Sequence, residues 1–335
     1  MKTAVFSSKP HDFQFLSEAN QKLDRPHEFN FLELRLTEKT VRLAEGHQAV
    51  CGFVNDEFTA QVLTQLAAFG IKIIALRCAG FNNVDLEAAE QIGLPVVRVP
   101  YYSPHAVAEH TLCLMLALNR QVYRAHQRIR EGDFSLHGLM GFDMFGKTVG
   151  VVGTGAIGQC VVRILNGLGC QVLAYDVHPQ PAVVAAGATY VDLETVLFES
   201  DIVTLHCPLL PETHHLISAQ RIERMKPGVM IINTSRGGLV DARAVIDGLK
   251  SRKIGALGLD VYEEEADLFF EDRSNDLLQD DVFARLTTFP NVLVTGHQAF
   301  FTKEALQQIA KTTVESLASF EANLPLTFQL KYSNA

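Results

Sequence analysis

The sequence predicts an α/β protein of two parallel β-sheets, each covered by helices on both faces. Short apolar runs alternate with segments of helical periodicity along most of the 335 residues, and this alternation is typical of parallel sheets. A glycine-rich turn of the form G-x-G-x-x-G lies mid-chain rather than after the first strand. A chain of this length is also expected to form two domains. We therefore expect two α/β halves, of which the second begins at that turn.

The first half carries five apolar runs of strand length. Strands are expected over residues 3–7, 29–34, 49–54, 71–76 and 94–99, with helices around residues 13–23 and 58–67. No glycine fingerprint follows the first strand, so this half is not expected to hold a nucleotide. The loop after the fourth strand contains a glycine and small residues, and such a loop can offer backbone N–H groups to a carboxylate. The alternative is a plain turn built on Gly80 and two asparagines.

A long apolar helix is expected to connect the halves. Ser103 is a favourable N-cap, and Pro104 suits the first helical position. Apolar positions carry this helix through Leu118 towards Tyr123, and the glycine-rich and aromatic segment 132–146 is expected to form a surface loop.

The second half begins with a strand over residues 148–152. Further strands are expected over residues 171–175, 189–191, 201–206, 229–233, 256–259 and 292–295. Asp241 is expected to cap a helix, and a helix over residues 303–320 closes the chain. A polar loop of about twenty residues follows Glu265, and loops of that length usually serve function or assembly.

Gly153, Gly155 and Gly158 predict a dinucleotide-binding turn. The first makes the tight turn, the second lets the backbone approach a pyrophosphate, and the third lets helix and strand pack closely. The following helix N-terminus would direct N–H groups at the phosphates. Asp176 ends the next strand, 18 positions after Gly158, where an acidic residue can bind ribose hydroxyls. Its charge would repel a 2′-phosphate, so NAD is preferred over NADP; the alternative is an ordinary strand-end residue.

Three strand ends of the second half carry polar groups, namely Arg236, the acidic run 263–265 and His297. Each has a structural explanation when taken alone. Because parallel strands end on one edge of a sheet, we expect the three groups to lie together beside the nicotinamide. An arginine fork can bind a carboxylate and polarise the neighbouring carbonyl, and a histidine can donate the proton as hydride arrives. The sequence therefore predicts hydride transfer to a small 2-oxo acid.

Three further histidines lie in the second half, at positions 206, 214 and 215. His206 ends a strand on the same side and is expected to line the pocket, with Cys207 and Pro208 packing the nicotinamide ring. His214 and His215 stand in a polar turn and are expected to lie on the surface, and no metal site is predicted.

Composition narrows the possible partners. The net charge of −9 and the lack of a basic cluster argue against a nucleic-acid partner. The six cysteines form no C-x-x-C pair, so we expect neither a zinc site nor a disulfide framework, and a reduced cytoplasmic setting. Residues 1–6 read as the start of a strand, so no signal peptide is expected, and the apolar run 112–118 is too short to span a membrane.

The chain resembles the D-isomer-specific 2-hydroxyacid dehydrogenases along essentially its whole length. The resemblance rests on RCAGFNNVDL at 77–86, YSPHAVAEHTL at 102–112, GKTVGVVGTGAIG at 146–158, INTSRGGLVD at 232–241, GLDVYEEE at 258–265 and GHQAF at 296–300. It implies an NAD-binding Rossmann domain over residues 102–298. This domain would be inserted into a discontinuous, flavodoxin-like substrate domain formed by residues 1–101 and 299–335. A homodimer or homotetramer is implied as well.

The resemblance also assigns roles residue by residue. Arg236 would bind and polarise the substrate, His297 would be the acid and base, and Glu265 would hold His297. The implied substrate-binding residues are Ala79, Gly80, Tyr102, Phe53 and Phe300. The implied cofactor-binding residues are Val107, Gly153, Gly155, Ala156, Ile157, Gly158, Asp176, His206, Cys207, Pro208, Thr234, Ser235 and Asp260, the last near the nicotinamide amide.

The reaction expected from the resemblance is reduction of pyruvate to D-lactate with NADH. A broader reductase of glyoxylate, hydroxypyruvate or phenylpyruvate is the alternative, because Phe53 lacks the hydroxyl that some relatives carry as tyrosine. Bulky Phe53 and Phe300 still favour a small side chain such as the methyl of pyruvate. A non-catalytic, NAD-sensing binding protein is a further alternative, which the set Arg236, Glu265 and His297 disfavours.

Overall fold

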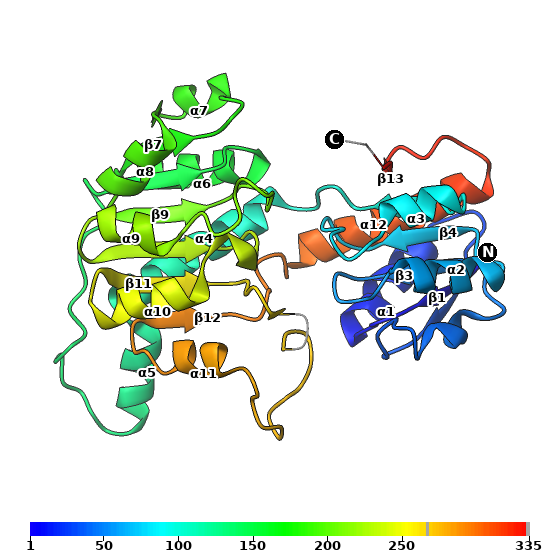
Figure 1. The fold of residues 1–335 in the computed structure, drawn as a ribbon, viewed down its shortest axis with the longest axis horizontal. Helices are drawn as coiled ribbons and strands as arrows, with labels where there is room; N and C mark the ends of the chain where they lie inside the picture. Colours follow the sequence, from blue (N-terminus) through cyan, green and yellow to red (C-terminus); the bar gives the residue numbers. More distant parts are fainter. Residues whose placement is uncertain (266–267, 333–335) are drawn as a thin grey trace. The chain divides into compact units, whose positions relative to one another are not determined.

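A computed structural model of the chain describes residues 1–265 and 268–332 (Figure 1). The chain forms two compact units, Met1–Ser103 with Phe301–Ala335, and Pro104–Phe300. The chain passes between them at 103/104 and 300/301, each two residues after the crossings expected at 101/102 and 298/299. The expected fold class, with two parallel-sheet α/β halves, is confirmed.

Unit 1 contains a six-stranded sheet in the order β13-β5-β4-β3-β1-β2. Its strands are β1 (Lys2–Val5), β2 (Glu28–Phe31), β3 (Ala49–Gly52), β4 (Ile73–Leu76), β5 (Val96–Arg98) and β13 (Gln329–Leu330). The first five are parallel and follow the flavodoxin order 2-1-3-4-5, while β13 pairs antiparallel with β5.

Helices cover both faces of this sheet because successive strand side chains point in opposite directions. Val50 packs in one core with η1 (Val41–Ala44), α2 (Ala60–Ala68) and α3 (Leu86–Gln91). The next residue, Cys51, packs in another core with α1 (Pro10–Asn20) and α12 (Lys303–Glu321). The C-terminal helix therefore belongs to the fold of the N-terminal hundred residues.

Unit 2 contains a seven-stranded, wholly parallel sheet in the order β12-β11-β10-β9-β6-β7-β8. Its strands are β6 (Thr148–Val152), β7 (Gln171–Tyr175), β8 (Ala188–Tyr190), β9 (Ile202–Leu205), β10 (Val229–Asn233), β11 (Ile254–Leu259) and β12 (Val292–Val294). Counted from β6, this is the Rossmann order 3-2-1-4-5-6 with one more strand.

Two cores enclose the sheet of unit 2. One core packs α4 (Pro104–Arg120), α6 (Ala156–Gly167) and α7 (Pro181–Ala185) on one face. The other packs α8 (Leu193–Glu199), α9 (Ala219–Arg224), α10 (Ala242–Lys250) and α11 (Asp281–Thr287) on the opposite face. Asp241 caps α10, as expected, by accepting the N–H groups of Arg243 and Ala244 at 3.0 Å.

The helix expected to run from Pro104 towards Tyr123 is interrupted, so that prediction was wrong at its end. Helix α4 stops at Arg120, Gln121 is left-handed with φ 48° and ψ 39°, and α5 (Val122–Arg130) begins a new helix. Helix α5 buries none of its residues, so hydrophobic periodicity carried no information about where it starts.

Several short elements were not expected from the sequence. Helices α3, α7, α8, α9 and α11 have five to seven residues, too few for a reliable helical period. Helix α11 begins at Asp281, so the Asp-rich loop after Glu265 is shorter than the expected twenty or so residues; residues 266–267 of this loop lie outside the described residues. None of the described helices combines the length and apolar character that crossing a bilayer requires.

Candidate active site

The glycine-rich turn leads from β6 into α6 and leaves no room for side chains at two of its glycines. Gly153 has φ +94°, and a Cβ there would lie 2.5 Å from the carbonyl carbon of His206. A Cβ on Gly158 would lie 2.1 Å from the oxygen of Gly153. Gly155 is the N-cap of α6, and nothing lies within 4 Å of its Cβ position. The start of this 12-residue helix, at Ala156, therefore adjoins open space, which suits a pyrophosphate.

Asp176, at the end of β7, is held by the same turn. Its Oδ2 accepts the backbone N–H of Thr154 at 2.6 Å and the Thr154 hydroxyl at 3.1 Å, and its Oδ1 accepts the N–H of His178 at 2.9 Å. Burial alone would raise the pKa of Asp176, but these hydrogen bonds outweigh it and lower the pKa. The residue is thus a carboxylate at neutral pH, as recognition of ribose hydroxyls requires. The hydroxyl of Tyr190, 2.7 Å from Thr154 Oγ1, completes a network that the sequence did not reveal.

The carboxyl ends of β9, β10, β11 and β12 share one edge of the sheet because these neighbouring strands are all parallel. His206, Arg236, Asp260 and His297 follow these four strands in turn. The backbone links the last two loops, since the N–H of His297 donates to the oxygen of Asp260 at 2.7 Å. The loops that carry these residues therefore leave the same edge of the unit 2 sheet.

His297 and Glu265 form a half-buried, directed pair at this edge. His297 Nδ1 lies 2.8 Å from Glu265 Oε1, and the two side chains are 19% and 22% exposed. Glu265 Oε2 accepts the N–H of Tyr262 at 2.9 Å, which fixes the carboxylate. His297 Nε2 has no hydrogen-bond partner among the described residues. The pair therefore orients one ring nitrogen and leaves the other for a reacting group.

Asp260 organises the loop that carries His297. Its carboxylate is fully buried and accepts the hydroxyl of Thr295, the N–H of Gln298 at 2.9 Å and the N–H of Ala299 at 2.8 Å. His297 itself has φ +52°, a left-handed conformation that is uncommon for residues other than glycine. Asp260 thus supports the backbone that sets the direction of the His297 ring.

The loop after β10 is fixed from within by Asn233. The buried Asn233 side chain donates to the oxygen of Arg236 at 2.8 Å and accepts the N–H of Ser235 at 3.0 Å. Ser235 Oγ donates to the oxygen of Cys207 at 2.7 Å, and Thr234 Oγ1 lies 2.9 Å from Thr111 Oγ1. Asn233 was missed by sequence reasoning, although it is the last residue of an otherwise apolar strand.

His206 and Cys207, which follow β9, are uncharged at neutral pH. Burial lowers the pKa of His206 to about 3 and raises the pKa of the Cys207 thiol to about 11. His206 Nε2 lies 2.9 Å from Thr204 Oγ1, while Pro208 is exposed. Val107 is buried in α4, and Ile157 is half-buried in α6. A neutral imidazole at this edge avoids repulsion with the positive ring of an oxidised nicotinamide.

The remaining predicted residues, except Phe300, lie in unit 1. Ala79 and Gly80 are half-buried, and their N–H groups donate to no acceptor within the described residues. Their carbonyls are engaged, that of Ala79 by Arg98 Nη1 at 2.7 Å and that of Gly80 by a neighbouring thiol. The guanidinium of Arg77 lies 4.9 Å from the centre of the Phe53 ring. Tyr102 and Phe300, near the ends of the two units, are half-buried.

Comparisons with known proteins agree with this arrangement. Residues 112–299 match the family described as "D-isomer specific 2-hydroxyacid dehydrogenase, NAD binding domain". The chain belongs to this family. It is 55% identical to D-lactate dehydrogenase of Escherichia coli K12 over 321 residues, which is 96% of this chain and 97% of that protein. NAD is thereby confirmed as the cofactor for which the chain has a domain.

Solved structures show the same fold. The chain superposes with a TM-score of 0.92 on the structure described under "Identification of the pyruvate reductase of Chlamydomonas reinhardtii", at 49% identity and 98% coverage of both chains. It also superposes on D-lactate dehydrogenase with NAD+ from Lactobacillus jensenii, with a TM-score of 0.83, 32% identity and coverage of 99% and 100%.

Proposed function

We propose that this protein catalyses the reversible reduction of pyruvate to D-lactate by NADH. The observation that carries the proposal is the His297–Glu265 pair, with Nδ1 held at 2.8 Å and Nε2 without a partner among the described residues. The loops of this pair and of Arg236 leave the same edge of the sheet in a family NAD binding domain. D-lactate as the product follows from the relatives that carry that name.

Arg236, His297 and Glu265 of unit 2 have separate roles in the proposed reaction. NADH, when bound, would supply the hydride that the carbonyl carbon of the 2-oxo acid accepts. Arg236 holds the carboxylate and polarises the carbonyl. His297 Nε2–H donates its proton to the carbonyl oxygen, while Glu265 accepts the Nδ1–H and stabilises the ring in that orientation. In the reverse direction Nε2 accepts the hydroxyl proton.

The remaining predicted residues take supporting roles. We assign the glycine turn with Ala156 and Ile157 to the pyrophosphate, Asp176 to the ribose, and Thr234, Ser235, His206, Cys207, Pro208, Val107 and Asp260 to the nicotinamide half. Ala79 and Gly80 are assigned to the substrate carboxylate through their N–H groups. Phe53, Tyr102 and Phe300 are assigned to the substrate side chain and favour a small one.

We also propose that the protein is a cytoplasmic homo-oligomer. None of the six cysteines, all of which lie among the described residues, forms a disulfide, as in a reducing compartment. The segment 122–145 exposes large apolar side chains, including Phe134 at 75%, Leu136 at 84%, Met140 at 91% and Phe145 at 79%. Apolar groups gathered in this way mark interaction surfaces, and a second copy of the chain is the proposed partner.

An initial-rate panel tests the proposal. Pyruvate, glyoxylate, hydroxypyruvate and phenylpyruvate are each assayed with NADH and NADPH, and the product hand is determined by chiral chromatography. We expect the highest kcat/KM with pyruvate and NADH, and D-lactate as the product. Turnover of none of the four acids would contradict an enzymatic function, and a preference for a bulky acid would contradict the assignment of the substrate.

A further inference from the structure

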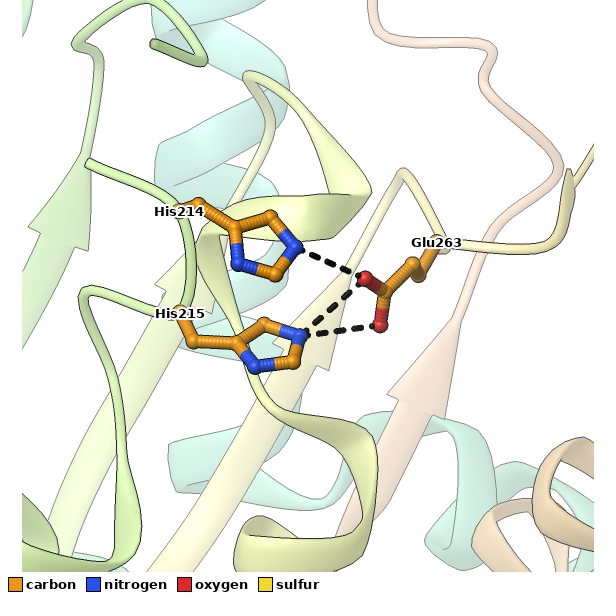
Figure 2. A group of neighbouring side chains, drawn as sticks. All are labelled: His214, His215 and Glu263. Atoms are coloured by element: carbon orange, nitrogen blue, oxygen red, sulfur yellow. Dashed lines mark hydrogen bonds and ion pairs between the residues drawn. The ribbon is translucent and has the colours of Figure 1, made fainter. Parts of the chain in front are cut away.

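Three side chains with metal-ligating atoms converge at the surface of unit 2, outside the set assigned to the reaction. His214 and His215 come from the turn after β9, and Glu263 comes from the segment after β11 (Figure 2). His214 Nε2 lies 3.3 Å from Glu263 Oε1, and His215 Nε2 lies 3.0 Å and 3.2 Å from the two carboxylate oxygens. The surface position of both histidines was expected from the sequence, but their convergence on Glu263 was not.

The spacing of these atoms matches a coordination sphere. Zinc bonds to histidine nitrogen and carboxylate oxygen measure about 2.0–2.2 Å, so neighbouring ligand atoms of a tetrahedral ion lie about 3.3–3.5 Å apart. The two nitrogen–oxygen separations that involve Glu263 Oε1, 3.3 Å and 3.0 Å, are close to this edge length. One ligand atom from each residue lies within 4.8 Å of the others. An ion therefore requires only small side-chain adjustments.

The turn presents both rings to the same side. The imidazoles stack with centroids 3.9 Å apart and planes inclined by 26°, and this alignment directs both Nε2 atoms at Glu263 (Figure 2). His215 has φ +49°, and its N–H donates to the oxygen of Gly238 at 2.8 Å. The N–H of His214 donates to the oxygen of Leu210 at 2.9 Å. The backbone that aims the two rings is thus fixed without the ion.

The position of Glu263 is fixed by close packing. Tyr262 is buried, and a Cβ on Gly237 would lie 2.1 Å from the Tyr262 carbonyl carbon. The three ligating side chains remain 50%, 34% and 31% exposed, so an ion has access from solvent and keeps a position for water. Two imidazoles and one carboxylate select zinc-like transition metals over magnesium or calcium, which prefer oxygen ligands.

We propose that His214, His215 and Glu263 form a binding site for one divalent transition-metal ion of the Zn²⁺ class. Each ring binds the ion through an unprotonated Nε2 and carries its one proton on Nδ1. The bonds of the ion join the turn after β9 to the segment that leads from Glu263 into Glu265. Occupancy therefore stabilises unit 2, and this inference does not depend on the reaction assigned to the protein.

Calorimetric titration of the full chain with Zn²⁺ tests the site. The protein carries no affinity tag and has Cys113→Ser throughout, because this cysteine is exposed and its thiol could bind zinc. We expect one saturable Zn²⁺ site per chain and no comparable binding of Mg²⁺. His214→Gln, His215→Asn and Glu263→Gln should each weaken Zn²⁺ binding by more than about tenfold. Asparagine is chosen at position 215 because it tolerates a left-handed backbone.

A matched control removes two other exposed histidines, His126→Gln with His137→Gln, and should leave the Zn²⁺ affinity unchanged. NADH affinity and circular dichroism report whether each variant is folded. If a variant does not fold, the visible absorption of Co²⁺ bound to the Cys113→Ser protein decides, because tetrahedral coordination by nitrogen and oxygen gives intense bands. Absence of saturable Zn²⁺ binding, affinity retained in all three ligand variants, or a Co²⁺ spectrum of the octahedral aqua ion overturns the proposal.

Discussion

The carboxylate of Asp260 accepts the backbone N–H of Ala299 at 2.8 Å and so ties the end of β11 to the loop that carries His297. The same carboxylate accepts the N–H of Gln298 at 2.9 Å. Asp260 is fully buried, and its two oxygens are occupied by this loop and by Thr295. The residue therefore positions His297 through the backbone, whatever it also contributes to the nicotinamide.

Asp260→Asn tests this positioning role. The amide replaces one accepting oxygen by a donor, so one loop N–H loses its partner, at a cost of about 1–3 kcal/mol. We expect kcat to fall by about 10–100-fold, corresponding to that cost, with a smaller change in the pyruvate KM. Stopped-flow kinetics, with NADH binding measured in parallel, shows whether the substitution changes kcat more than KM. An unchanged kcat would show that the loop is held without Asp260.

Asp176→Ala tests the ribose assignment. The substitution removes a carboxylate that accepts the N–H groups of Thr154 and His178. The negative charge of this carboxylate would repel a 2′-phosphate. We expect kcat/KM for NADH to fall and the preference for NADH over NADPH to narrow by about tenfold or more. Asp192→Ala, which removes a helix cap on α8, is the matched control. Equal cofactor ratios in wild type and the Asp176 variant would count against the assignment.

His206 predicts how stability depends on pH. The folded pKa of about 3 lies below the unfolded value of about 6.5, because burial disfavours the imidazolium. Between these values the unfolded chain binds a proton that the folded chain does not. The contribution of neutral His206 is complete above about pH 6.5 and is lost as pH falls towards 3.

His206→Gln removes this titration while keeping a polar group near Thr204. Urea unfolding at about pH 7.5 and about pH 5 gives the free energy of unfolding of both proteins. The drop on acidification should be smaller in the variant by roughly 1–2 kcal/mol. Parallel pH profiles for the two proteins would mean that His206 titrates normally in the folded state.

The exposed apolar side chains of segment 122–145 are predicted to form the contact between two copies of the chain. Leu136 and Met140 are 84% and 91% exposed, so a charge at either position should leave the isolated chain folded and weaken contacts with a second copy. We expect Leu136→Asp with Met140→Asp to elute at a smaller size than wild type in size-exclusion chromatography with light scattering. A monomeric wild type would remove the basis for the oligomer, and an unchanged size of the variant would place the contact elsewhere.

Much of the fold was readable because its strands are short, apolar and bounded by polar residues. The strands over residues 148–152, 171–175 and 229–233 were expected at the observed bounds. The glycine turn could be predicted because a side chain at position 153 or 158 would clash with nearby backbone atoms, so only glycine fits there. The break at Gln121 was not readable, since helix α5 buries no side chain that could set a period.

The supporting residues of the candidate site were harder to predict. Asn233 acts through hydrogen bonds to backbone groups of the loop that follows it. Thr154 acts through hydrogen bonds to the side chains of Asp176 and Tyr190, which neighbouring strands bring near. Both residue types occur widely in turns. The convergence of Glu263 with His214 and His215 joins segments that are 48 and 49 positions apart. Spacing along the chain cannot show such a meeting, whereas the order of β9, β10 and β11 in the sheet does.

The proton-donor role of His297 is the centre of the account, and the most direct test is turnover of His297→Ala with pyruvate and saturating NADH. With no imidazole to donate the proton, kcat should fall by about 10²–10⁴-fold. NADH affinity, measured by fluorescence, should stay close to wild type, since the glycine turn and Asp176 are untouched. A kcat near that of wild type with intact NADH binding would contradict the account.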